Sequence, residues 1–253
     1  MEDKLSYLID KAKSYHEQLP PKVVISGLPK FSSYLDASLH SSEATPVVIK
    51  GLCADAVKYQ FATVFTNPIF VPLVKECLAG SSVRVGTVAG FPLGAYPTNI
   101  KVAEARAYIN AGADEIDMVM SVGMLKAGDY QLIFDDIKAM AEEVHSHNKL
   151  LKVIIEAVLL TKYEKILSCL ICQAAGADFV KTSTGFSKGG ATVEDVDLMR
   201  RVVGPEMGVK AAGGIHHLNE ALAMIKAGAN RLGTSAAVRI IKEYQQKKAI
   251  KGA

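Results

Sequence analysis

The sequence has no long apolar run and no strong excess of charge of either sign. No stretch approaches the roughly 18 apolar residues of a membrane span, so we expect no membrane partner. Its 29 Lys and Arg face 26 Asp and Glu, a formal net charge of +3 without a basic block, and we expect no nucleic acid partner. The start at Glu2, Asp3 and Lys4 is unlike a signal peptide and predicts a cytoplasmic protein.

Cysteine is also scarce, with four residues in 253. Cys169 and Cys172 form a C-x-x-C pair, a spacing found in zinc and redox sites. No second pair and no neighbouring histidine supports a metal site, and the surrounding sequence has the pattern of a buried helix face. We therefore predict that both cysteines pack in the core, with metal or redox chemistry as the alternative.

Linkers are missing as well. No Pro/Ser-rich or low-complexity tract interrupts residues 23–240, and 49% of the chain is hydrophobic, which is enough for one substantial core. We predict a single domain over residues 1–253. Its ends are expected to differ from the rest, with an N-terminal helical extension at 1–22 and a flexible tail at 245–253.

Short β-branched runs alternate with segments of helical pattern. Strands separated by helix-length connections pair in parallel, and runs that are mostly apolar along their length indicate strands buried on both faces. The pattern predicts an α/β protein with a (β/α)8 TIM barrel rather than an open doubly wound sheet. The expected strands are a first one near 34–36, then 61–65, 83–88, 115–120, 151–156, 179–182, 209–212 and 231–233.

A short phrase recurs where a helix is expected to end and a strand to begin. Its three copies, each with the core Ala-Gly-Ala and then Asp or Asn, span 110–114, 174–178 and 226–230. Glycine is the usual left-handed stop of a helix. The repeat therefore supports regular alternation of helices and strands.

Polar residues stand at the ends of several expected strands, where such barrels build their active sites. In chain order they are Asp36, Asn67, Asp117, Glu156, Lys181 and Lys210. Lys181 and Lys210 end successive strands, so we expect their amines to lie close together. Burial and a second cation both lower the pKa of a lysine, and a neutral amine is a nucleophile toward a carbonyl carbon.

Each of these groups also has a structural interpretation. Both lysines could reach solvent or pair with carboxylates, and Asp117 could form a buried salt bridge. The same geometry suits an acid/base relay in which Asp117 keeps Lys210 charged and moves protons. Two lysines at successive strand ends favour the relay, with Lys181 as the nucleophile.

Glycine-rich loops follow the last two expected strands, a region where barrel enzymes bind phosphate through backbone N–H groups and a helix N-terminus. One such loop is weak evidence because Gly-Gly is a common turn, but two in these positions predict a phosphate site. The candidate substrate- and phosphate-binding residues are Thr182, Gly185, Gly213, Gly214, Gly233, Thr234 and Ser235.

Four segments resemble the deoxyribose-phosphate aldolase family, and the resemblance covers residues 31–240. The segments are TVAGFPLG at 87–94, GADEIDMV at 112–119, FVKTSTGF at 179–186 and GVKAAGGI at 208–215. Four long segments in the right order make the resemblance specific.

The resemblance implies a class I aldolase, a lyase that reversibly cleaves 2-deoxy-D-ribose 5-phosphate into D-glyceraldehyde 3-phosphate and acetaldehyde, with no metal or organic cofactor. By this likeness, Lys181 forms the Schiff base, Lys210 lowers its pKa and Asp117 transfers protons. Asp36 supports the relay or binds a substrate hydroxyl, and the glycine-rich loops hold the phosphate. The implied partners are small phosphorylated sugars and aldehydes.

The chain departs from the family pattern at three positions. Ala37 follows Asp36 where the family usually has a histidine, so an imidazole beside the acid is lost. Phe65 stands where many members have a cysteine, which removes a reactive thiol and is expected to change the tolerance to aldehydes. His216 stands where an arginine commonly follows Gly-Gly-Ile, which bears on the strength of phosphate binding.

Two other functions stay open. An aldolase with a different aldehyde acceptor would fit Phe65 and His216, and a non-catalytic barrel that binds a phosphometabolite would not need Lys181. The sequence does not decide between a monomer and a homodimer, because apolar outer positions on barrel helices occur in both.

Overall fold

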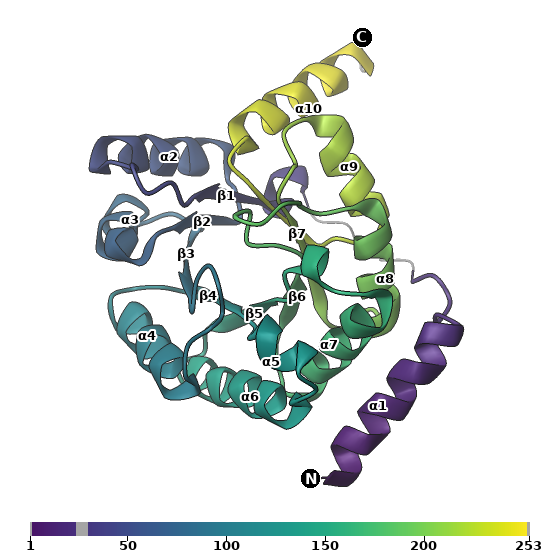
Figure 1. The fold of residues 1–253 in the computed structure, drawn as a ribbon. Coiled ribbons are helices and arrows are strands. Elements are labelled where there is room, and N and C mark those ends of the chain that lie inside the picture. Colours follow the sequence, from purple (N-terminus) through teal and green to yellow (C-terminus); the bar gives the residue numbers. More distant parts are fainter. Residues whose placement is uncertain (1, 24–29, 252–253) are drawn as a thin grey trace.

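Eight parallel strands close into a barrel inside a ring of helices (Figure 1). The computed structural model describes residues 2–23 and 30–251. Neighbouring strands follow chain order, and β8 pairs back with β1. The strands are β1 (Leu35–Leu39), β2 (Thr63–Thr66), β3 (Arg84–Ala89), β4 (Glu115–Val119), β5 (Leu150–Ile154), β6 (Phe179–Lys181), β7 (Gly208–Ala212) and β8 (Arg231–Thr234). Each predicted run overlaps one of these strands, so the predicted (β/α)8 barrel is confirmed.

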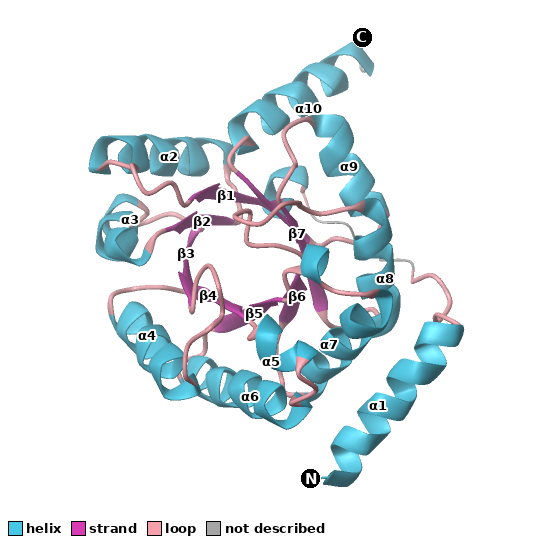
Figure 2. Ribbon diagram, viewed as in Figure 1, coloured by secondary structure: helices cyan, strands magenta, loops and turns pink. Residues whose placement is uncertain are grey.

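Helices connect the strands and cover the outside of the barrel (Figure 2). They are α2 (Pro46–Tyr59), α3 (Val71–Cys77), α4 (Thr98–Asn110), α5 (Val122–Lys126), α6 (Tyr130–Ser146), α7 (Lys162–Ala174), α8 (Val193–Val203), α9 (Leu218–Lys226) and α10 (Ala237–Lys251). The N-terminal helix α1 (Glu2–Glu17) lies outside this ring against α7, where the Lys4 amine donates to the Ala174 carbonyl at 2.9 Å. None of the described helices is long and apolar enough to cross a membrane.

The flexibility predicted for the tail at 245–253 stays a prediction, but the described part of this segment is helical. Helix α10 continues to Lys251, and residues 252–253 lie outside the described part of the chain. Gln, Lys and Ala are good helix formers, and residues 245–250 are exposed. The polar composition of this segment therefore reflects a helix with solvent on most sides.

The thrice-repeated phrase has two structural roles. Its glycine ends a helix at positive φ, which is 116° at Gly112, 93° at Gly176 and 113° at Gly228. Its Asp or Asn then accepts a hydrogen bond from the backbone N–H of the preceding strand. These bonds join Asp114 to Val85 (3.1 Å), Asp178 to Leu151 (2.8 Å) and Asn230 to Val209 (3.0 Å). The phrase thus stops a helix and fixes the next strand beside its neighbour.

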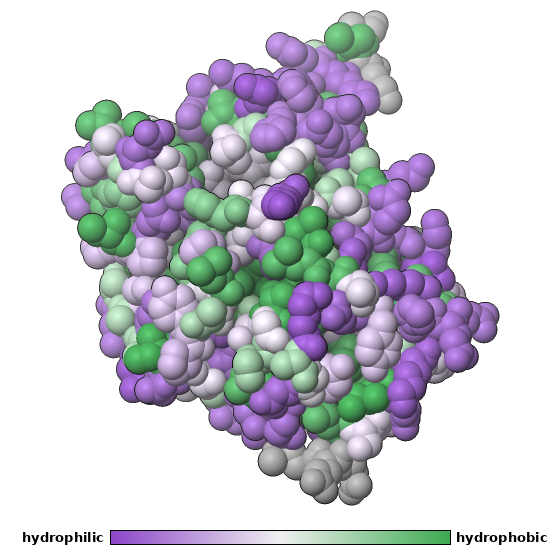
Figure 3. All heavy atoms as spheres, viewed as in Figure 1, coloured by the Kyte–Doolittle hydropathy of each residue, from purple (hydrophilic) through white to green (hydrophobic). Residues whose placement is uncertain are grey.

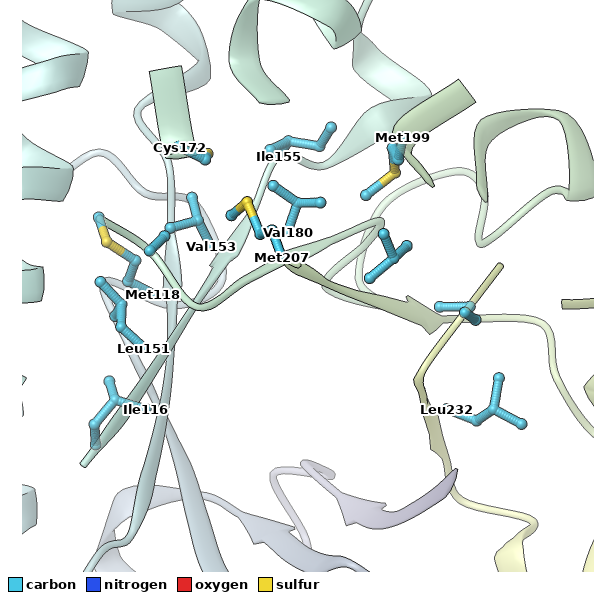
Figure 4. Packing of buried hydrophobic residues seen from close by; sticks show 14 of the residues in the cluster. Ile116, Met118, Leu151, Val153, Ile155, Cys172, Val180, Met199, Met207 and Leu232 are labelled. Carbon is cyan, nitrogen blue, oxygen red and sulfur yellow. The ribbon is translucent and has the colours of Figure 1, made fainter. Parts of the chain in front are cut away.

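Both faces of the strands are buried, as predicted, but the outward face is apolar whereas the inward face mixes charged and apolar side chains. Outward side chains pack against the helices (Figure 4), among them Ile116, Met118, Leu151, Val153, Val180 and Leu232, all with no exposed area. The expectation of apolar runs on both faces is wrong for the barrel interior, because charged residues such as Lys152 alternate with this apolar set.

The two cysteines of the C-x-x-C pair lie in α7 and belong to the same apolar layer. Neither Cys169 nor Cys172 has exposed area, which confirms the prediction of core packing. Burial raises the pKa of both thiols, so they are protonated at neutral pH.

Candidate active site

Lys181 and Lys210 lie side by side inside the barrel. They are partners in the β6–β7 register, and their side chains are 4% and 1% exposed. One oxygen of Asp117, Oδ2, accepts hydrogen bonds from both amines, each at 2.8 Å. The two strand-end lysines are therefore brought together by a single carboxylate on β4.

Further charged groups continue this network toward the N-terminal end of the barrel. Lys210 also lies 2.7 Å from Asp36 Oδ2, and the Arg231 guanidinium lies 2.7 Å from Asp36 Oδ1. Arg231 and Lys152 both pair with Glu115, and Lys152 lies 3.2 Å from Asp117 Oδ1. We call the seven residues the barrel cluster: Asp36, Glu115, Asp117, Lys152, Lys181, Lys210 and Arg231.

The barrel cluster contains one more basic group than acidic groups. Four buried cationic side chains share three buried carboxylates. An unbalanced charge away from water is costly, so one basic group is expected to lose its proton most readily. Position in the network decides which one.

Lys181 is that group. Burial lowers its pKa most, Asp117 opposes this, and Lys210 lowers it further, to about 8. Burial also acts to lower the pKa of Lys210, but Asp117 and Asp36 outweigh it and raise this pKa above its ordinary value. Burial acts to raise the pKa of Asp117, yet the surrounding lysines hold it well below its usual range. The result is an ionised carboxylate between a charged amine and one that deprotonates easily.

Phe65 occupies the space between the lysines. Its ring centroid lies 3.6 Å from Lys210 Nζ, 4.7 Å from Lys152 Nζ and 6.0 Å from Lys181 Nζ. A Cβ on Gly86 would come within 2.5 Å of this ring, so the glycine on the neighbouring strand makes room for it. The aromatic face stabilises the nearby cations and excludes water from the barrel cluster.

A cavity of about 220 Å³ opens above Lys181. Its lining residues are Ser38, His40, Lys181, Thr184, Gly185, Ala212, Gly213, Gly214, Ile215, His216, Gly233, Thr234 and Ser235. Gly213 and Gly214 have positive φ, and α10 begins two residues after Ser235. The loops predicted to bind phosphate therefore form one wall of a cavity that has Lys181 in its lining.

Other predicted residues lie near this cavity in different ways. Gly185 lines it, whereas Thr182 is fully buried and its hydroxyl exchanges hydrogen bonds with the backbone of Ala212 (3.1 and 3.0 Å). Asp36 lies in the barrel cluster and does not line the cavity. Asn67 donates to the Ser41 carbonyl at 3.1 Å and so holds the loop after β1.

Glu156 lies at the strand end where it was expected, in a left-handed conformation with φ 42°. It accepts a hydrogen bond from the Thr184 hydroxyl and lies at the mouth of the barrel. Apolar surface gathers toward the centre of the face seen in Figure 3, and exposed apolar residues in the loops after the strands include Leu93, Val158, Leu159 and Phe186. The entrance to the charged interior is thus lined by both polar and apolar groups.

Sequence reasoning missed several members of the site. Lys152, Glu115 and Arg231 lie within or at the start of strands, whereas only strand ends were searched. Glu115 and Asp117 are two residues apart and so share a face, which was a usable signal. His40 was missed because it follows β1 by one residue and carries no motif.

Comparisons with known proteins find aldolases both by sequence and by fold. A sequence model of the DeoC/LacD family aldolases matches residues 34–240. The deoxyribose-phosphate aldolase of Streptococcus uberis is 54% identical over 212 residues, which cover 84% of this chain and 96% of that protein. The crystal structure of a putative deoxyribose-phosphate aldolase from Coccidioides immitis has a TM-score of 0.89 at 38% identity. The match covers 97% of this chain and 98% of the crystallised chain. Deoxyribose phosphate aldolase from Aeropyrum pernix, described as tetrameric, has a TM-score of 0.81 at 28% identity. The match covers 98% of this chain and 99% of the Aeropyrum chain.

Proposed function

Because this chain belongs to the DeoC/LacD family of aldolases, we propose that it reversibly cleaves 2-deoxy-D-ribose 5-phosphate into D-glyceraldehyde 3-phosphate and acetaldehyde through a Schiff base on Lys181. The observation that carries the proposal is the position of Lys181. Its amine lines the cavity, has a lowered pKa and shares Asp117 with a second lysine.

The reaction follows from these contacts. The neutral Lys181 amine adds to the aldehyde carbon C1 of the open-chain sugar, and loss of water gives a protonated imine. When the C3 hydroxyl loses its proton, C3 becomes a carbonyl, the C2–C3 bond breaks, and its electron pair moves toward the imine to give an enamine. Glyceraldehyde 3-phosphate leaves, C2 takes up a proton, and water releases acetaldehyde from Lys181.

Asp117 and Lys210 have complementary roles in this sequence. Lys210 is held charged and can donate protons, while the ionised Asp117 contacts both amines and can pass protons between them. Asp36 holds Lys210 from the opposite side. The side chains of the barrel cluster thus supply the nucleophile, the electron sink formed on it and the proton relay.

The glycine-rich loops hold the phosphate in this proposal, which places the aldehyde end at Lys181. A comparison of kcat/KM for 2-deoxyribose 5-phosphate and 2-deoxyribose tests this part. We expect a clear preference for the phosphorylated sugar. Equal values would contradict a phosphate site and would favour a different aldehyde acceptor.

Reductive trapping tests the covalent step. Acetaldehyde with borohydride is expected to leave an ethyl group on Lys181, found by peptide mass mapping, and to abolish turnover. Lys101 serves as an internal control because it is also buried but lies outside the barrel. Its amine, on α4, pairs with Asp136 of α6 at 2.6 Å. Active protein that stays unlabelled at Lys181 would contradict the mechanism.

A cytoplasmic location and a homodimer belong to the same proposal. Cell fractionation tests the first. Light scattering tests the second, and the tetramer described for the Aeropyrum pernix relative is the outcome that would replace it.

A further inference from the structure

His40 brings an imidazole into the active-site cavity from the loop that follows β1. Asp36, Ser38 and His40 alternate along the inward side of the chain, and both Ser38 and His40 line the cavity together with Lys181. The His40 ring packs on Phe91 with 5.4 Å between centroids, and Phe91 packs edge-on against Phe186 at 5.3 Å. The ring is thus held in place by aromatic neighbours.

One ring nitrogen of His40 has no hydrogen-bond partner among residues 2–23 and 30–251. Nδ1 is buried and makes no hydrogen bond to any residue in the described ranges. Buried polar atoms are nearly always hydrogen-bonded, so an unpaired nitrogen in a ligand cavity points to a group supplied by the ligand.

The surroundings keep this imidazole neutral. Burial lowers the pKa of His40 most, Lys181 and Lys210 lower it further, and Asp117 and Asn67 act in the opposite direction, which leaves it at about 3. A neutral imidazole has one nitrogen that donates and one that accepts. It therefore suits a hydroxyl group, which also donates and accepts, better than it suits a phosphate.

The proposed substrate carries such a hydroxyl between its two ends. In the proposed function the aldehyde carbon lies at Lys181 and the phosphate at the glycine-rich loops, and His40 belongs to the lining of the same cavity, where it can meet the carbons between the two ends. The C3 hydroxyl reacts, whereas the C4 hydroxyl stays intact and becomes the hydroxyl beside the carbonyl of glyceraldehyde 3-phosphate.

We propose that His40 is a specificity-determining residue that hydrogen-bonds this non-reacting hydroxyl and so selects hydroxylated, phosphorylated aldehydes as acceptors. The inference rests on the proposed function, because that function decides which end of the substrate lies at Lys181. It assigns to His40 no part in bond making or in proton transfer to carbon.

The test compares two acceptors in the synthesis direction, with acetaldehyde as donor: D-glyceraldehyde 3-phosphate and 3-oxopropyl phosphate, which lacks the hydroxyl. His40→Leu is expected to lower kcat/KM for the hydroxylated acceptor by roughly tenfold, the scale of one neutral hydrogen bond. It should leave the other acceptor nearly unchanged. His40→Gln keeps a donor and an acceptor and should restore part of the preference. His147→Leu, which changes an exposed histidine paired with Glu143 at the end of α6, is the matched control.

Two results would overturn the inference. One is an equal loss of kcat/KM with both acceptors in His40→Leu, and the other is an unchanged preference for the hydroxylated acceptor. Either would show that His40 does not hydrogen-bond the hydroxyl. Trapping of acetaldehyde on Lys181 in the unmodified enzyme separates this failure from failure of the proposed function, which would abolish trapping.

A measurement on the unmodified enzyme covers the case in which the variants do not fold. The ¹⁵N resonances of the His40 ring are expected to shift when glyceraldehyde 3-phosphate binds and to stay nearly constant with 3-oxopropyl phosphate. Equal shifts with the two compounds, or none with either, would contradict the role given to His40.

Discussion

The inward and outward faces of the barrel strands are buried to the same extent, and neighbouring residues of one strand can belong to opposite environments. On β5, Leu151 and Val153 pack against the helices, while Lys152 between them contacts Glu115 and Asp117 in the interior. The outward face is apolar and closely packed, whereas the inward face holds a network of charges beside the rings of two phenylalanines.

The difference indicates that the two faces serve different ends. Burial of apolar area stabilises a fold, whereas a buried ion network often contributes little because each charge must leave water. A network with an excess of cations is a poor source of stability but a good means of lowering one lysine pKa. We therefore expect outward substitutions to affect mainly stability and inward substitutions to affect mainly chemistry.

The largest expected effect comes from Lys181→Met. Loss of the nucleophile should reduce kcat by on the order of 10⁴-fold or more. The fold should persist, because the remaining three cations of the barrel cluster balance its three carboxylates. Steady-state kinetics and urea unfolding check both parts. A variant that unfolds would contradict the claim that the Lys181 charge is in excess.

Asp117→Asn should affect both chemistry and stability. It removes the carboxylate that contacts three lysines, so we expect kcat to fall by about 10²- to 10⁴-fold, the usual scale of proton-transfer catalysis. The unpaired cations should also lower the free energy of unfolding by about 3–5 kcal/mol. Unchanged stability together with lost activity would show that the amines are paired in another way.

Ile116→Ala tests the outward face of the strand that carries Asp117. The side chain has no exposed area, so the cavity should lower the free energy of unfolding by about 2–5 kcal/mol. The kcat of the folded protein should be close to that of the unmodified enzyme. A large loss of kcat would mean that the two faces of β4 are not independent.

Lys210→Met should shift the pH dependence of the reaction. Removal of this cation leaves three cations for three carboxylates, so the pKa of Lys181 should rise. The pH at which kcat/KM reaches its maximum should rise with it. A pH profile measures this shift. Lys149→Met, at a partly exposed pair with Asp114, is the control and should leave the profile in place.

The smallest expected effect is on the pH dependence of stability. Lys181 has a folded-state pKa of about 8 against an ordinary 10.5, so between these values the unfolded chain binds more protons. The contribution of Lys181 to stability should therefore be least below pH 8 and should increase as the pH rises toward 10.5. Urea unfolding of the unmodified protein and of Lys181→Met across this range isolates the contribution, and parallel curves would contradict it.

The sequence predicted the barrel because helix-length connections, β-rich runs and repeated glycine stops all act locally. Lys181 and Lys210 could be placed together since successive parallel strands are neighbours. Lys152 was missed because it lies within its strand, although its partner Asp117 is on the preceding strand. Arg231 could not be placed as readily, because it contacts one carboxylate on β1 and one on β4, which are far away in the chain. The helical end of α10 was missed because a polar composition does not distinguish an exposed helix from a frayed tail.

The central claim is that the pKa of Lys181 is lowered to about 8, and the rate of reductive ethylation of Lys181 by acetaldehyde as a function of pH tests it most directly. We predict a half-maximal rate near pH 8, moved to higher pH in Lys210→Met. A half-maximal rate near pH 10.5 in the unmodified protein, the value of an ordinary lysine, would contradict the account.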